Sequence, residues 1–94
     1  MSHELHIKPV QWATSENLEV VDRRCTYLFD CFCEQRNIMA LAYLMHAWPL
    51  TSTTPEALHN LFEVLGNLRR LHGNLLASEQ RGVIDKVLDH LAGA

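Results

Sequence analysis

Apolar positions recur at helical spacing along most of the chain and predict an all-α fold, a small bundle of three to four helices. The clearest case lies between residues 55 and 75, where leucines follow one another at intervals of three, four, three and seven residues: Leu58, Leu61, Leu65, Leu68 and Leu75. All members of this leucine stripe share one face of a helix, because a helix turns once in about 3.6 residues. The stripe therefore indicates burial against other helices, and it carries no chemistry.

Two further segments show the same periodicity. A helix is expected to begin at Thr14 or Ser15, where a hydroxyl can cap free backbone N–H groups, and its apolar positions are Leu18, Val21, Cys25, Leu28 and Phe32. A last helix is expected to begin at Ser78, with apolar positions at Val83, Ile84, Val87, Leu88 and Leu91. One apolar face on each is typical of the helices of a bundle.

The leucine-rich helix has two candidate starts. Thr54 can cap it with Pro55 at the first helical position, or Thr53 can cap it with Glu56 as its partner in a capping box. The helix is expected to end before Gly73, because basic side chains precede that glycine and both features are common at helix C-termini.

Residues 38–45 are apolar on all sides, a pattern normally found in a helix at the centre of a bundle. Asn37 can take the left-handed backbone conformation and end the preceding helix, which predicts a tight turn at residues 35–37 and a compact hairpin. The alternative is one long helix over residues 15–47, which favours an extended dimer. The apolar segment ends at Trp48-Pro49, because proline disfavours a helical conformation in the residue before it.

The start of the chain has a different pattern from the rest. Residues 1–13 lack a helical period and contain Pro9, so they are interpreted as an extended or flexible N-terminal arm. Residues 14–94 are interpreted as a single α-helical domain, because no repeat, low-complexity stretch or second domain interrupts them.

Composition adds an expected oligomeric state. Hydrophobic residues make up 48% of the 94 residues and charged residues only 20%, so few charges have to cover much apolar surface. A domain of this size is marginally stable alone, and a homodimer would bury the excess apolar surface.

The net charge of −3 argues against direct nucleic-acid binding, which needs a basic face. No secretory signal begins the chain and its longest apolar run is too short to cross a membrane, so we expect a cytoplasmic protein.

The three cysteines, Cys25, Cys31 and Cys33, are interpreted as small buried hydrophobes. On a helix Cys31 and Cys33 point to opposite sides, and Cys25 is too far along the axis from Cys31 for a disulfide. A disulfide between subunits through Cys31 or Cys33 is the alternative.

No arrangement of residues predicts catalysis, a metal or a cofactor. The histidines are dispersed, and His59 with Glu63 has metal-ligand spacing but lacks further ligands. The serines lie at expected caps, in loops or near the terminus, without a motif around them. The protein is therefore predicted not to be an enzyme.

The remaining hypothesis is a regulatory protein that binds another protein. We expect it to be an antagonist, or anti-activator, that covers the dimerisation or activation surface of a transcription regulator with a helical face. Aromatic and arginine side chains dominate interface energetics, so the candidate contact residues are Arg23, Tyr27, Tyr43, Trp48 and Leu50. The alternatives are a redox- or ligand-sensing bundle, with Cys31 or Cys33 reactive, and a structural subunit of a larger complex.

Overall fold

A computed structural model describes residues 15–50 and 54–92 of the chain. Within these ranges the protein forms four α-helices and no strand, which confirms the predicted all-α bundle: α2 (Ser15–Gln35), α3 (Ile38–Met45), α4 (Pro55–His72) and α5 (Ser78–Ala92). A short 3₁₀ turn, η1 (Gly73–Leu75), follows α4. The predicted N-terminal arm, residues 1–13, lies outside the described residues.

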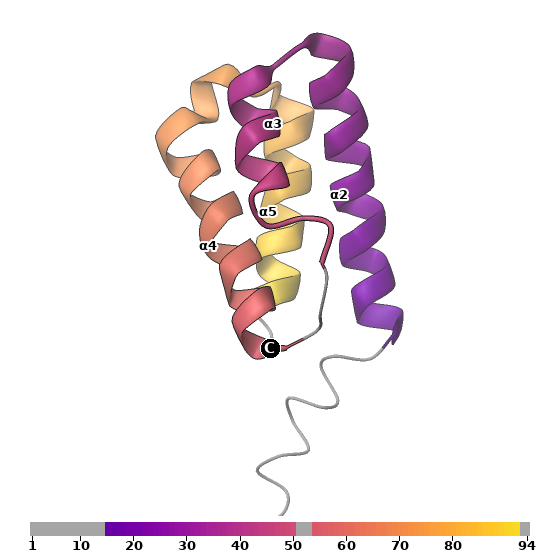
Figure 1. Cartoon of the computed structure of the whole chain (residues 1–94). Helices are drawn as coiled ribbons and strands as arrows, with labels where there is room; N and C mark the ends of the chain where they lie inside the picture. The colour runs from indigo at the N-terminus through magenta and orange to yellow at the C-terminus, as the bar shows by residue number, and fades with distance from the viewer. Residues whose placement is uncertain (1–14, 51–53, 93–94) are drawn as a thin grey trace, which may run out of the picture.

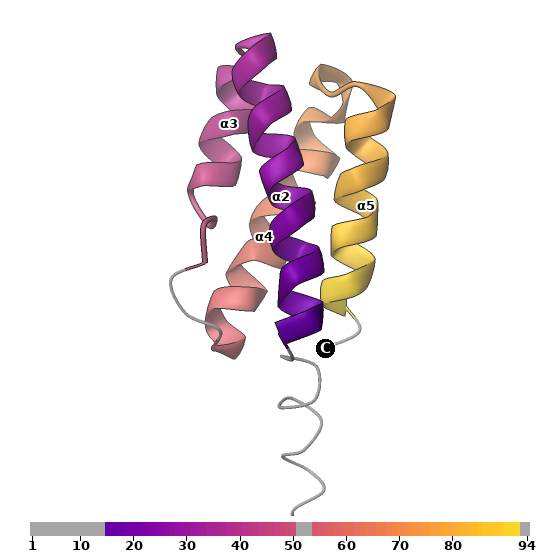
Figure 2. The same cartoon turned by 90° about the vertical axis from the view of Figure 1, so that its right-hand side faces the viewer.

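Consecutive helices run in opposite directions, and each packs against the one before it (Figure 1). Since α5 also packs against α2, the four helices form a closed ring around one core, with up-down-up-down topology (Figure 2). In the view of Figure 1, α3 lies in front, between α4 and α2, and α5 lies behind it.

The ends of α4 and α5 follow from local sequence signals. The Thr54 hydroxyl accepts a hydrogen bond of 3.2 Å from the backbone N–H of Ala57, and Pro55 is the first residue of α4, so the first of the two predicted starts is the one adopted. The helix ends at His72 as expected. At the start of α5, the Gln80 side chain accepts a hydrogen bond of 3.0 Å from the backbone N–H of Ala77.

A turn separates α2 from α3, so the long helix over residues 15–47 does not form. The left-handed residue is Arg36, with φ of 55°, and not Asn37 as expected. The backbone N–H of Asn37 donates to Phe32 and that of Arg36 to Cys33, a Schellman pattern at the end of α2. Asn37 takes a φ of −83° because its side chain caps the next helix, accepting from the N–H of Ala40 at 3.2 Å.

The core is built from the predicted apolar positions of α2, α4 and α5. Its fully buried large side chains include Phe32, Leu28, Leu61, Leu65, Leu68 and Ile84. Four members of the leucine stripe are buried, whereas Leu75 is 50% exposed. The expectation for Leu75 was wrong because α4 ends at His72, so the following turn no longer continues its helical face.

The sequence predicted that α3 lies at the centre of the bundle, and this prediction was wrong. Of its eight residues only Ala40 and Leu44 are buried, while Ile38, Met39 and Met45 are 70%, 45% and 58% exposed. The reason is topological: in a ring of four helices each member turns only one side to the core and leaves the other side outside.

Candidate functional site

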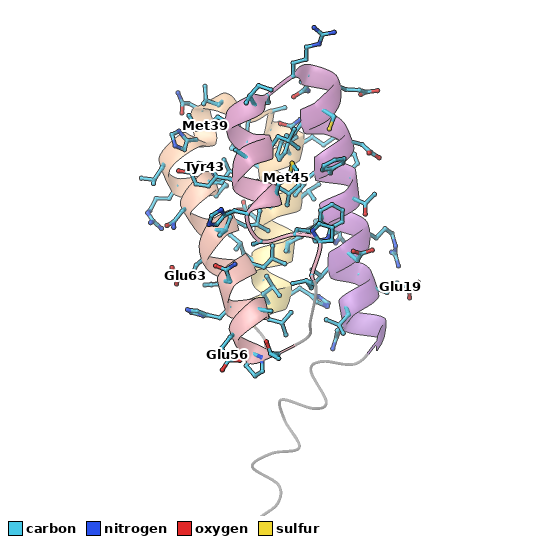
Figure 3. All side chains as sticks on the ribbon, in the orientation of Figure 1. Glu19, Met39, Tyr43, Met45, Glu56 and Glu63 are labelled. Carbon is cyan, nitrogen blue, oxygen red and sulfur yellow. The ribbon has the colours of Figure 1, made fainter. Side chains whose placement is uncertain are left out.

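The outward side of α3 is an exposed apolar surface. This helix contains no charged residue, and Ile38, Met39, Ala42 and Met45 are all exposed on it. Figure 3 shows Met39 and Met45 on different sides of α3, and at 100° per residue Ile38 and Ala42 lie between them. We refer to these four residues as the exposed α3 face. Contiguous apolar surface of this kind is typical of sites where another molecule binds.

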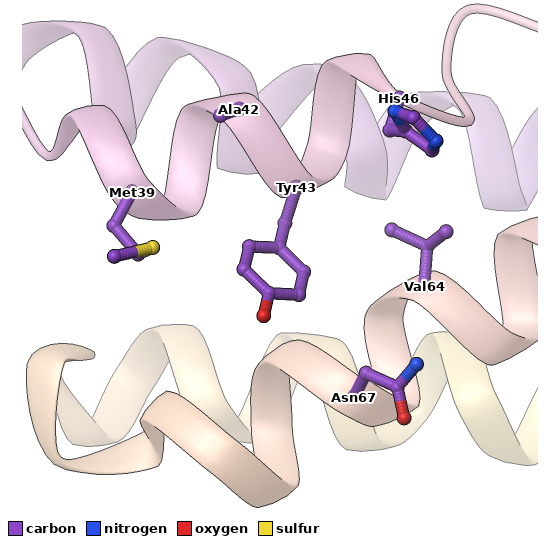
Figure 4. Close-up of a pocket in the computed structure, with 6 residues that line it drawn as sticks. All are labelled: Met39, Ala42, Tyr43, His46, Val64 and Asn67. Carbon is purple, nitrogen blue, oxygen red and sulfur yellow. The ribbon is translucent and has the colours of Figure 1, made fainter.

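A shallow groove lies beside this face, between α3 and α4. Its volume is about 350 Å³, and its lining residues are Met39, Ala42, Tyr43, His46, Val64 and Asn67. In the close-up of Figure 4, the Tyr43 side chain extends from α3 towards α4, with Met39 and His46 on either side of it along α3. The groove therefore combines apolar walls with a phenol, an imidazole and an amide, the combination expected where a partner is both buried and oriented.

Tyr43 is held in place by the end of α4. Its hydroxyl lies 3.2 Å from Nε2 of His72, and the two rings meet edge to face with centroids 5.3 Å apart. Next to His72 in the chain, Leu71 is 59% exposed. The apolar surface of α3 thus has a further apolar side chain available on α4.

The upper end of α3 is tied to η1. The Asn37 amide nitrogen donates a hydrogen bond of 3.0 Å to the backbone carbonyl of Leu75, whose side chain is half exposed. The same Asn37 side chain also caps α3, so it makes two contacts at once. Together these contacts hold the first turn of α3 next to η1, the 3₁₀ turn that follows α4.

Two of the predicted contact residues, Trp48 and Leu50, lie partly buried against the core below α3. The Trp48 indole nitrogen donates a 3.1 Å hydrogen bond to the Asp22 carboxylate, and its ring lies 5.8 Å from that of Phe29, measured between centroids. Because α3 is much shorter than α2, this segment covers the part of α2 that α3 does not reach (Figure 1). These contacts give both residues a role in the single chain.

The other predicted contact residues, Arg23 and Tyr27, are exposed on α2. A hydrogen bond with Cys31 is the main cause that raises the pKa of Tyr27 to about 12, and Glu79 of α5 adds to it. Tyr27 thus lies on the α5 side of α2, whereas Tyr43 lies between α3 and α4. The structure does not bring the five candidate residues together on one surface.

The three cysteines are all free. Cys25 is buried as expected, and burial, followed by the nearby Asp22 carboxylate, raises the pKa of its thiol to about 12. Cys31 is half-buried and Cys33 is exposed. The interpretation as a buried hydrophobe was wrong for Cys33, because that residue lies on the side of α2 away from the core stripe.

The described residues form neither a metal-ligand cluster nor a membrane-spanning helix. Among the residues that the structure describes, no three histidine, cysteine or acidic side chains converge as metal ligands. His59 Nε2 lies 3.6 Å from the Glu63 carboxylate, a pair on one exposed helix surface. Within the described ranges, every helix is too short or too polar to cross a bilayer.

The sequence did not predict that Ile38, Met39 and Met45 of α3 are surface residues. A helix that is apolar all round is normally buried, and the same was expected here. A signal was present in the length of the segment: the ten residues between Asn37 and Trp48 allow fewer than about three helical turns, too few to span a core lined by helices of 15 to 21 residues.

In comparisons with known proteins, no family model, no curated protein and no solved structure matches this chain.

Proposed function

We propose that this protein is a non-enzymatic regulatory module that binds another protein through the exposed α3 face and the groove beside it. The observation that carries this proposal is the exposure of Ile38 and Met45, at 70% and 58%, on a helix without a single charge. Leaving side chains exposed to this extent forgoes about 1–2 kcal/mol of burial free energy for each. A partner that covers them recovers this free energy.

The chemistry of the surface favours an apolar helix as the bound element. The groove between α3 and α4 can accept one row of apolar side chains, as in helix-in-groove recognition. Tyr43 is held by His72, so little side-chain entropy is lost when a partner contacts it. His46 and Asn67 offer polar groups at the rim that can orient the partner.

Within this class, we propose an anti-activator that acts in the cytoplasm on a transcription regulator. It would cover the regulator's own dimerisation or activation surface, which in many regulators is an apolar helical face. The net charge of −3 supports action on the protein and not on its DNA, because phosphate contacts need a basic surface.

The test uses a double variant, Ile38→Glu with Met45→Lys, which keeps the net charge and matches the dipole of α3. Tagged wild-type protein is used to capture partners from its native lysate, and a captured regulator is purified for a DNA-binding assay. We expect wild type to abolish DNA binding by the regulator and the double variant to leave it intact.

The matched control exchanges two exposed charges on α5, Lys86→Asp with Asp89→Lys, again at constant net charge. Both positions lie on α5, which is across the bundle from α3 (Figure 1), so this control variant should inhibit the regulator as wild type does. Unchanged DNA binding in the presence of wild type would disprove the antagonism. Equal inhibition by wild type and by the Ile38→Glu, Met45→Lys variant would disprove the assignment of the surface.

A further inference from the structure

Two opposite charges border the groove on its α4 side. Glu63 and Arg70 are seven residues apart, so they lie on the same side of α4, two turns from each other. Both are exposed, and Figure 3 shows Glu63 on the outer flank of that helix. Within the chain their contacts are weak surface ones: Glu63 with His59 at 3.6 Å, and Arg70 with the Asn67 side chain.

The groove lies between these two charges along the helix. Its α4 residues, Val64 and Asn67, both fall within the interval from Glu63 to Arg70. Its α3 side carries no charge. An interface centred on the groove therefore has a negative charge at one end of its α4 border and a positive charge at the other.

This arrangement is complementary to itself. When two copies face each other about a two-fold axis perpendicular to α4 and centred near Asn67, their α4 helices run antiparallel. Glu63 of one copy then lies opposite Arg70 of the other, and the symmetry repeats the pair. The α3 helix of each copy lies beside the C-terminal half of its own α4, as the contact of Tyr43 with His72 shows, and brings no charge to the interface.

We propose that the α3–α4 groove is a two-fold interface with a second copy of this chain, in which Glu63 of each copy pairs with Arg70 of the other. Composition favours this occupant, because hydrophobic residues at 48% and charged residues at 20% leave a small domain with more apolar surface than its charges cover. Leu71, 59% exposed in the single chain, lies next to Arg70 and becomes covered in the pair.

The size of the surface sets the strength of the dimer. With the axis near Asn67, the two α4 helices overlap over residues 61–72, about 18 Å, and α3 adds about 12 Å of helix. At a width of about 10 Å for each helix, the footprint is on the order of 300 Å² per copy, below the usual range for specific interfaces. The dimer is therefore reversible. It uses the groove, which shares Met39 and Ala42 with the exposed α3 face, so self-association and binding of another protein compete. The dimer itself goes beyond the proposed function and does not require it.

Sedimentation velocity of the purified full-length chain, over a wide range of concentrations at low salt, tests the dimer. Wild type is expected to shift from monomer to dimer with concentration. Glu63→Arg makes both border positions positive, and Arg70→Glu makes both negative, so each variant alone should dimerise about tenfold more weakly. An equimolar mixture of the two variants restores opposite charges across the interface and should dimerise as wild type does.

Glu56→Arg is the control, because it makes the same charge change on the same outer side of α4, one heptad from Glu63 and two from Arg70. It should leave the dimerisation constant unchanged. Circular dichroism establishes that each variant is folded. A wild type that stays monomeric at every concentration overturns the proposal, and so does a mixture that dimerises no better than its components. No other protein is in the sample, so either result is independent of the regulator assay.

Discussion

Helices α3 and α4 pack side by side and differ in how their sequences relate to burial. Helix α4 alternates leucines with polar residues, and the four leucines Leu58, Leu61, Leu65 and Leu68 are buried on one face. Helix α3 is apolar at every position, yet buries only Ala40 and Leu44. The polar side of α4 predicts which side of the helix faces solvent, and therefore which side faces the core. A helix without a polar side allows no such prediction, and its burial depends on how many helices pack against it.

The two helices are also held by different forces. Burial of leucine side chains stabilises α4, at about 1.5–3 kcal/mol for each fully buried one. Helix α3 has fewer such contacts and depends on interactions at its ends: the Asn37 cap, the bond from Asn37 to Leu75, and the Tyr43–His72 contact. Its remaining apolar side chains are therefore available for contacts outside the chain.

The largest expected effect tests this contrast within α4. Leu68→Ala removes a fully buried side chain and should lower the free energy of unfolding by about 2–5 kcal/mol, through lost burial and the cavity left behind. Leu71→Ala, three residues away at a position 59% exposed, should change it by less than about 0.5 kcal/mol. Guanidinium unfolding followed by circular dichroism, at a low protein concentration that favours the monomer, measures both. Equal losses would disprove the orientation of α4.

A second effect concerns the buried polar residue of α5. Gln80 is 1% exposed; its side chain accepts from the Ala77 N–H and donates to the Gln35 side chain at 2.9 Å. Gln80→Leu keeps a similar volume but leaves the Ala77 N–H unpaired, which should cost about 1–3 kcal/mol of unfolding free energy. Gln35→Leu, at the exposed partner, should cost less. Chemical unfolding of both variants compares the two, and a larger loss at Gln35 would contradict the assignment.

A third effect separates the two roles of Asn37 at the start of α3. Asn37→Ala removes both the helix cap and the bond to Leu75, and should lower the unfolding free energy by about 1–2 kcal/mol. Asn37→Asp keeps the cap oxygen and loses only the amide donor, so it should retain most of that stability. Hydrogen exchange of the Ala40 amide reports the cap directly. Fast exchange in Asn37→Asp would show that the cap does not act as described.

The all-α class was predictable from the sequence because periodicity and capping residues are local, whereas the number of helices stayed open between three and four until the turn after α2 was seen. The end of α4 at His72 and the start of α5 at Ser78 were expected and are confirmed, and of the two candidate caps of α4 the one adopted is Thr54. The left-handed position was misplaced by one residue, from Arg36 to Asn37. Asparagine favours both a left-handed conformation and a helix cap, and the sequence does not indicate which use prevails.

The candidate site was less predictable, because it depends on contacts between distant segments. Trp48 and Tyr43 were chosen for their residue type, and the structure shows one against Asp22 and Phe29 and the other in the groove. The exposed α3 face was missed because apolar composition alone predicts burial, whatever the number of neighbours. Glu63 was considered for its metal-ligand spacing with His59, and the position of the groove is what relates it to Arg70.

The smallest expected effect is the most direct test of α3 as a surface helix. Ile38→Glu with Met45→Lys replaces two exposed apolar residues by charges that suit the dipole at the two ends of α3. The unfolding free energy of the monomer should therefore change by no more than about 0.5 kcal/mol. Leu44→Glu, on the same helix but fully buried, is the matched control and should unfold the chain or cost several kcal/mol, because it places a charge in the core. Unfolding curves at low protein concentration compare the two. A loss above about 1.5 kcal/mol in the double variant would show that Ile38 and Met45 are buried within the single chain, and the binding surface would then have to lie elsewhere on the bundle.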